Sequence, residues 1–177
     1  MNEKQKARLI LKTLNKIYPK TPIPLKHNNK FTLLISVLLS AQCTDLNVNN
    51  VTKKIYPKYY TPKHFVKLGR KNIERLIKSI GIFRIKAKSI YLTSKKILKD
   101  HNGKVPKSFE ALEELPGVGH KTASVVMSQG FGFPAFAVDT HIHRLAQRWG
   151  LTSGKNVVQT EKDLKRIFPE KTWNKLH

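Results

Sequence analysis

Apolar residues recur at helical spacing through most of the chain. In the segment 29–42 (NKFTLLISVLLSAQ) they fall at Leu33, Leu34, Val37, Leu38 and Ala41, which predicts a helix buried on most sides. Similar patterns predict helices over 61–69, 72–81, 83–100, 108–115, 120–130, 139–150 and 156–168. No segment alternates strictly enough for a strand, so the predicted fold class is all-α.

Start and stop signals frame several of these helices. Thr61 is a favourable N-cap, Pro62 suits the first helical position, and Gly69 supplies a stop. Asn156 and Gln159 stand at the spacing of a capping box.

Two proline-containing loops, at 18–29 and 131–137, are predicted crossings between two helical lobes. The central lobe would span 22–134. The second lobe would combine 1–21 with 135–177, so that a helix at the start of the chain packs with the last helices.

Charge narrows the class of partner. The 177 residues include 34 Lys and Arg against 11 Asp and Glu, a formal net charge of +23. Such a surface attracts polyanions, of which nucleic acid is the commonest.

The start of the chain does not resemble a secretory signal, and the longest apolar stretch is too short to cross a bilayer. We therefore expect an intracellular, nucleoid-associated or cytoplasmic protein with no membrane partner. Cys43 is the single cysteine, which excludes an internal disulfide and a multi-cysteine metal site.

The stretch LPGVGHKTAS, residues 115–124, carries candidate chemistry. Gly117 and Gly119 allow positive φ and, with Val118 between them, are expected to expose successive backbone N–H groups to a phosphate. A helix from His120 would add its own unpaired N–H groups. With a helix on each side, residues 109–130 match a helix-hairpin-helix, a motif that binds DNA without reading sequence; the alternative is an ordinary turn between packed helices.

Lys121 follows this turn directly and has two possible roles. It could neutralise a phosphate, or it could act as a nucleophile, because an ammonium at a helix N-terminus, partly buried among other cations, is disfavoured relative to the neutral amine. Asp139, 18 residues later in AVDTHIHR, could be brought back near the lysine. Asp139 or Thr140 is equally suited to cap the next helix, and capping is compatible with a catalytic role.

These residues resemble the endonuclease III family of DNA glycosylases. LPGVGHKTASVV followed by AVDTHIHR carries the resemblance, and LLISVLLSAQCTD, IKSIGIFRIKAKSI, HNGKVP and GKNV are similar to further family blocks in the same order. The resemblance implies a two-lobed helical fold with a DNA cleft between the lobes. It implies that Lys121 attacks C1′ of the damaged nucleotide and that Asp139 helps to deprotonate the amine and stabilises charge on the sugar.

The resemblance also implies how the base is reached. Gln42 would fill the gap left by a flipped nucleotide, and Ile82 would wedge apart the neighbouring stack. A surface helix-end amide and a core side chain are the respective alternatives. His120 stands where many members have arginine and is expected to meet phosphate.

The expected function is therefore a glycosylase with abasic-site (AP) lyase activity. It would remove oxidised pyrimidines from double-stranded DNA as a monomer, through a lysine Schiff base and β-elimination. The rivals are a non-catalytic helix-hairpin-helix module and a glycosylase for another damaged base.

Cofactor use is the main departure from the resemblance. Members usually carry four C-terminal cysteines that bind a [4Fe–4S] cluster, whereas this sequence supports no cofactor and no metal site. We expect a second lobe that is truncated before that region, either because the protein is shortened or because the sequence is a fragment, and the cluster is expected only if a missing cysteine region exists. His141 and His143 are poor joint metal ligands, because helical residues two apart point about 200° apart.

Overall fold

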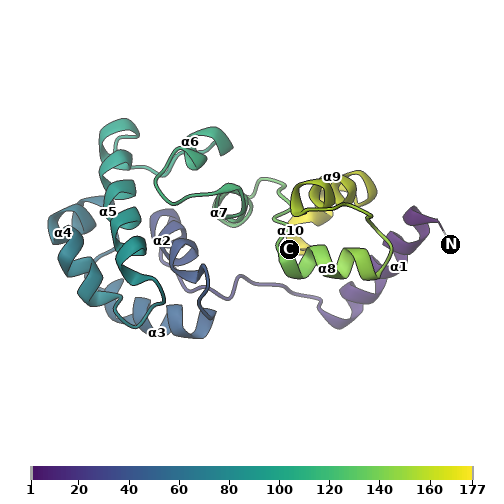
Figure 1. The fold of residues 1–177 in the computed structure, drawn as a ribbon, viewed down its shortest axis with the longest axis horizontal. Helices are drawn as coiled ribbons and strands as arrows, with labels where there is room; N and C mark the ends of the chain where they lie inside the picture. The colour runs from purple at the N-terminus through teal and green to yellow at the C-terminus, as the bar shows by residue number, and fades with distance from the viewer. Residues whose placement is uncertain (1, 177) are drawn as a thin grey trace. The chain divides into compact units, whose positions relative to one another are not determined.

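The computed structural model describes residues 2–176 of the chain. Every regular element in that range is a helix, which confirms the all-α prediction (Figure 1). The chain divides into two compact units, which we call the central unit (Ile23–Phe131) and the terminal unit (residues 2–22 and 132–176).

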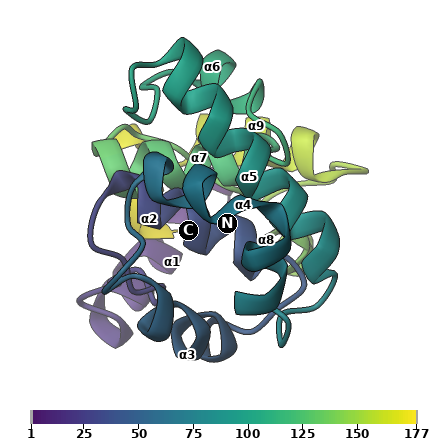
Figure 2. The ribbon, with the colours of Figure 1, turned by 90° about the vertical axis from the view of Figure 1, so that its left-hand side faces the viewer.

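Helix α2 is the core of the central unit. It spans Lys30–Ser40, and all residues from 31 to 39 are buried. Asn29 and Thr32 fix its start with reciprocal side-chain-to-backbone hydrogen bonds of 2.9 Å. Around it in Figures 1 and 2 lie the other elements that it contacts, which are α3 (Asp45–Ile55), α5 (Phe83–Asp100), α7 (His120–Val125) and the π-helical turn η1 (Val126–Gly130).

Helix α4 (Pro62–Leu76) packs along α5 (Figure 1). Thr61 caps it and Pro62 occupies its first turn, as predicted. Gly69 interrupts it with φ 74°, a left-handed conformation that glycine adopts without penalty. The helix expected over 72–81 is therefore the second half of α4, and it ends before the predicted stop at Gly81.

The segment 108–130 forms α6 (Phe109–Glu113), a turn, α7 and η1. Ser108 caps α6, as its sequence predicted. The single helix expected over 120–130 is wrong in its second half, because hydrogen bonding widens to a π turn from Val126 onward. Apolar periodicity over so few residues does not distinguish a π turn from an α turn.

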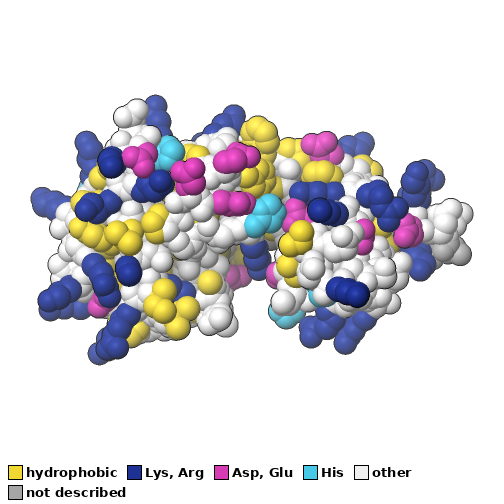
Figure 3. All heavy atoms as spheres, turned by 45° about the horizontal axis from the view of Figure 1, so that its top comes forward, with side chains coloured by type: hydrophobic (Ala, Val, Ile, Leu, Met, Phe, Trp, Pro, Cys, Tyr) yellow, Lys and Arg dark blue, Asp and Glu magenta, His cyan; other side chains and the backbone are white. Residues whose placement is uncertain are grey.

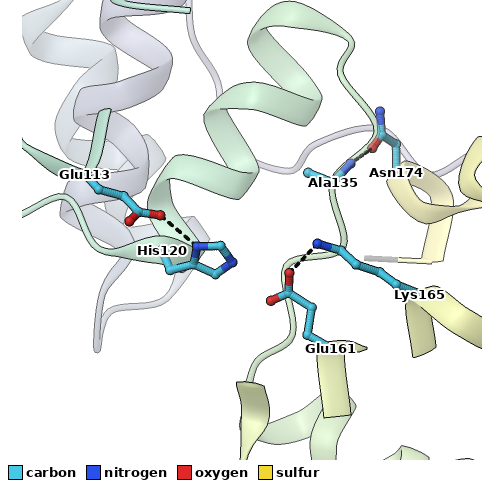
Figure 4. A network of polar contacts seen from close by, with 6 residues as sticks. All are labelled: Glu113, His120, Ala135, Glu161, Lys165 and Asn174. Carbon is cyan, nitrogen blue, oxygen red and sulfur yellow. Dashed lines mark hydrogen bonds and ion pairs between the residues drawn. The ribbon is translucent and has the colours of Figure 1, made fainter. Parts of the chain in front are cut away.

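The terminal unit contains α1, α8, α9 and two short C-terminal turns. Their bounds are Glu3–Ile17 (α1), Thr140–Arg148 (α8), Val157–Ile167 (α9), Glu170–Thr172 (3₁₀ turn η2) and Trp173–Leu176 (α10). The first helix packs against α9, and the shared core is made of Ala7, Phe136, Val138, Ala146, Leu151, Leu164, Ile167 and Phe168. The Asn174 side chain accepts a 2.9 Å hydrogen bond from the Ala135 amide, which ties the last turn to the connecting segment before α8 (Figure 4).

The capping box predicted at the start of α9 is half formed. Asn156 accepts the Gln159 backbone N–H at 2.9 Å, whereas the Gln159 side chain donates to the carboxylate of Asp163. That carboxylate also accepts from the Thr152 hydroxyl, and this hydrogen bond lowers the Asp163 pKa.

In residues 2–176 no helix combines the length and apolarity that a membrane crossing requires.

Candidate functional site

Gly117 shapes the turn between α6 and α7. Its φ of 83° confirms the predicted positive value. A Cβ at this position would lie 2.7 Å from both Cβ and Oγ of Ser89 on α5. The fold therefore requires glycine twice here, for the backbone angle and for the close approach of the turn to α5.

Gly119 behaves differently. Its φ of −96° and ψ of 178° are accessible to any residue, so the prediction of positive φ is wrong at this position. A Cβ would meet nothing within 4 Å. Neither backbone angle nor packing in this chain demands glycine at 119, and the open space beside it is available to a ligand.

Val118 faces the protein interior. Its side chain is 6 % exposed and its N–H donates to the Leu115 carbonyl at 3.0 Å. The expectation that successive N–H groups of the turn point outward is therefore wrong for Val118, because its amide closes the turn that carries the two glycines.

His120, the first residue of α7, is held on the exposed side of the hairpin. Its Nδ1 lies 2.7 Å from Oε1 of Glu113 at the end of α6 (Figure 4). Its ring stacks on Phe109 at a centroid distance of 5.9 Å. The two contacts fix the imidazole over the turn.

The structure places Lys121 at the second position of α7 in the central unit, where it is exposed, so the expectation of partial burial is wrong. Asp139 belongs to the terminal unit and caps α8. Its Oδ1 accepts hydrogen bonds from the N–H groups of His141 and Ile142, both at 2.9 Å. The predicted capping role of Asp139 is therefore confirmed. The two cap hydrogen bonds orient its half-buried carboxylate.

Gln42 and Ile82 lie on two loops of the central unit that touch each other. Gln42 follows the end of α2, and Ile82 immediately precedes α5. A Cβ built on Gly81 would lie 3.6 Å from the Gln42 carbonyl oxygen. Both side chains are exposed, Ile82 by 50 %, so the alternative of a core role for Ile82 is wrong.

Both residues are also held in left-handed backbone conformations. In residues 2–176 the non-glycine positions with positive φ are Gln42 (54°), Ile82 (50°) and Asn102 (52°). Asparagine tolerates this region, whereas a β-branched isoleucine is an outlier there, at a cost of about 1–3 kcal/mol. Strain of this kind persists where the surrounding structure imposes it, and it concentrates at functional sites.

Lys and Arg side chains are spread over both units on the face that Figure 3 shows, in keeping with the net charge of +23. His141 and His143 have separate partners. His141 Nδ1 lies 3.3 Å from the Arg144 guanidinium, whereas His143 Nδ1 lies 2.7 Å from the Thr160 hydroxyl.

Comparison with known proteins assigns the family. The sequence profile of the HhH-GPD superfamily of base excision DNA repair proteins matches residues 35–170, which is more than half of the chain. This chain belongs to that superfamily. It is 43 % identical to endonuclease III of Bacillus subtilis over 178 aligned residues, covering 100 % of this chain and 81 % of the relative. It is 45 % identical to endonuclease III of Escherichia coli K12 over 166 residues, covering 94 % and 79 %.

Solved structures of endonuclease III share the fold. A trapped endonuclease III–DNA covalent intermediate, an estranged-adenine complex, superposes with a TM-score of 0.95 at 43 % identity and covers 100 % of this chain and 84 % of that one. A non-covalent endonuclease III–DNA complex gives the same score and identity and covers 83 % of its own chain. A thermostable thymine-DNA glycosylase, 22 % identical with a TM-score of 0.85, shares the fold.

The residues of this chain do not fit the iron–sulfur cluster that the resemblance raised. A [4Fe–4S] cluster takes four cysteine thiolates. Cys43 is the one cysteine in the sequence, lies on the Gln42 loop of the central unit, and accepts a hydrogen bond from Asn47 at 3.3 Å. We derive no step through such a cluster.

Lys86, which lies at these loops, was not predicted as a site residue from the sequence. Lys86 on α5 is 5 % exposed, although lysine is among the residues least often buried. Its place four residues after Ile82, on the apolar face of the helix pattern, was the signal that could have identified it.

Proposed function

We propose that this chain is a base excision repair DNA glycosylase with AP lyase activity, acting on oxidised pyrimidines in double-stranded DNA. The observation that carries the proposal is Lys121, which stands directly after the hairpin turn of a superfamily member whose endonuclease III relatives include one trapped covalently on DNA. Hydrolysis without a covalent step would need no amine at this position.

The reaction would proceed by substitution at the sugar. The neutral Lys121 amine attacks C1′ of the extruded nucleotide, the bond from C1′ to the base breaks, and the base leaves with the electron pair and takes up a proton. The C1′–O4′ bond then breaks, the ring opens, O4′ takes up a proton, and C1′ becomes doubly bonded to the lysine nitrogen. The resulting imine makes the C2′ proton acidic, and its loss expels the 3′ phosphate by β-elimination. Asp139 would accept the amine proton and stabilise positive charge on the sugar, an electrostatic role for a carboxylate already fixed by its cap.

The hairpin and the two strained loops would serve binding. The open space at Gly119, with His120 oriented beside it, suits a phosphate. Gln42 and Ile82 would enter the duplex at the vacated position, because a base inside a stack cannot reach an amine. These steps draw on side chains of this chain alone, and we propose that the protein works as a monomer on intracellular DNA.

The test is borohydride trapping on duplex DNA that carries one abasic site. Borohydride reduces an imine to a stable amine, so we expect a covalent protein–DNA adduct that disappears in Lys121→Ala. Lys71→Ala, an exposed lysine of α4 in the same unit, is the matched control and should trap normally. DNA binding without any adduct would contradict the proposal and favour a non-catalytic module.

A further inference from the structure

Lys86 is a buried cation at the junction of the Gln42 and Ile82 loops. Its ammonium donates to the carbonyl oxygens of Leu39 at 2.8 Å and Ala41 at 2.6 Å. These carbonyls belong to the last turn and the C-cap of α2, where a helix leaves its C=O groups without intrahelical donors. A positive charge there also complements the negative end of the helix dipole.

The same residue is bonded to the second loop. The Lys86 backbone N–H donates to the Ile82 carbonyl at 3.2 Å, in the first turn of α5. One residue therefore links the backbone directly before Gln42, through its side chain, to the backbone of Ile82, through its main chain.

Asn47 on α3 provides a second link between the loops. Its side-chain amide donates to the Ser79 carbonyl at 3.1 Å and to Cys43 Sγ at 3.3 Å. Ser79 comes shortly before Ile82 in the sequence, and Cys43 directly follows Gln42. Asn47 therefore holds the residue after Gln42, whereas Lys86 holds the residue before it.

Stability is a poor explanation for a lysine at this place. Burial lowers the Lys86 pKa, and the nearby Cys43 opposes that shift, which means that the fold disfavours the charged form. Buried ionic groups are often replaceable by apolar side chains without loss of stability. What the ammonium provides is a fixed direction for two carbonyls next to a strained residue.

We propose that Lys86 is a positioning residue for DNA insertion, holding the loops of Gln42 and Ile82 in one rigid arrangement. Its ammonium would hold the Gln42 loop against the start of α5, whose first-turn hydrogen bond ends on Ile82, so that both exposed side chains keep one arrangement. This inference rests on the proposed function, because it assigns these loops to the opening of a damaged duplex.

The experiment compares the Lys86→Met protein with the wild type on the same abasic strand, once in a duplex and once single-stranded. Insertion is needed only in the duplex. We expect cleavage of the duplex to fall about tenfold or more, and cleavage of the single strand to change by less than about twofold. Lys99→Met, an exposed lysine at the end of the same helix, is the control and should leave both rates unchanged.

A readout without chemistry separates this inference from the proposed function. With 2-aminopurine opposite the abasic site, insertion disturbs stacking and raises fluorescence on binding. A signal in the wild type that is lost in Lys86→Met supports the positioning role even if no strand is cleaved, and absent cleavage would then contradict only the proposed function. The inference would be overturned by equal fluorescence signals in the wild type and Lys86→Met. It would also be overturned if the ratio of duplex to single-strand cleavage rates were the same in both proteins.

Asn47→Ala covers the case in which Lys86→Met does not fold. It removes the second link and leaves the buried ammonium in place, so we expect a smaller loss with the same selectivity for duplex. An Asn47→Ala protein that cleaves both substrates at wild-type rates would overturn the inference.

Discussion

The hairpin turn and the Gln42 and Ile82 loops use opposite backbone strategies within one unit. The turn meets its need for a left-handed angle with Gly117, which adopts φ 83° at no cost. The loops place glutamine and isoleucine at φ 54° and 50°, where side chains are strained. The difference follows what each would present to DNA, which is backbone at the turn and side chains at the loops.

The comparison explains where strain is tolerated. A site that offers open space beside its backbone loses nothing when glycine stands there. A site that must fill a gap in a base stack needs bulk, so the backbone carries the cost and neighbours such as Lys86 and Asn47 hold it in place. Three substitutions probe this contrast.

Gly117→Ala should have the largest effect on stability. The new methyl group would lie 2.7 Å from Ser89 at a backbone angle that disfavours a side chain, so we expect a loss of about 3 kcal/mol in the free energy of unfolding. Urea unfolding measures it. The double variant Gly117→Ala with Ser89→Gly should recover the steric part and not the angular part, and a fully additive cycle would contradict the close approach.

Ile82→Gly should separate stability from activity. Relief of the left-handed strain offsets the greater flexibility of glycine in the unfolded chain and the lost contacts of a half-exposed side chain. We therefore expect the unfolding free energy to change by less than about 1 kcal/mol. Cleavage of an abasic duplex should nevertheless fall about tenfold, because unstacking costs a few kcal/mol. A large loss of stability would identify Ile82 as a packing residue instead.

Gly119→Ala should have the smallest effect on the fold. Its backbone angles suit alanine and the methyl group would meet nothing, so unfolding should change by no more than about 0.5 kcal/mol. Affinity for duplex DNA should fall about threefold to tenfold, because the methyl group would occupy the space left for a phosphate. Unchanged affinity in a salt-matched titration would assign that glycine to neither fold nor binding.

Local signals were the part of the fold that sequence predicted well. Thr61 and Asp139 cap their helices because each short oxygen-bearing side chain accepts backbone N–H groups within a few residues, and that chemistry is visible in a short window. Gly117 belongs to the same class, since a proline before it and a lysine soon after mark a turn.

Long-range contacts set what the sequence could not predict. The Val118 side chain turns inward because the core of the central unit takes it, although the glycines on either side suggested an exposed backbone. Lys86 is buried because α2 ends 45 residues earlier with carbonyls that face it. Neither partner is indicated by local periodicity.

The central claim is that Lys121 Nζ bonds to the sugar, and locating the trapped adduct tests it most directly. The borohydride-reduced complex would be digested with nuclease and protease, and the modified peptide sequenced by mass spectrometry. We predict a single deoxyribose-derived modification on the amine of Lys121. Modification on any other lysine or on the N-terminal amine, with Lys121 unmodified, would contradict the account.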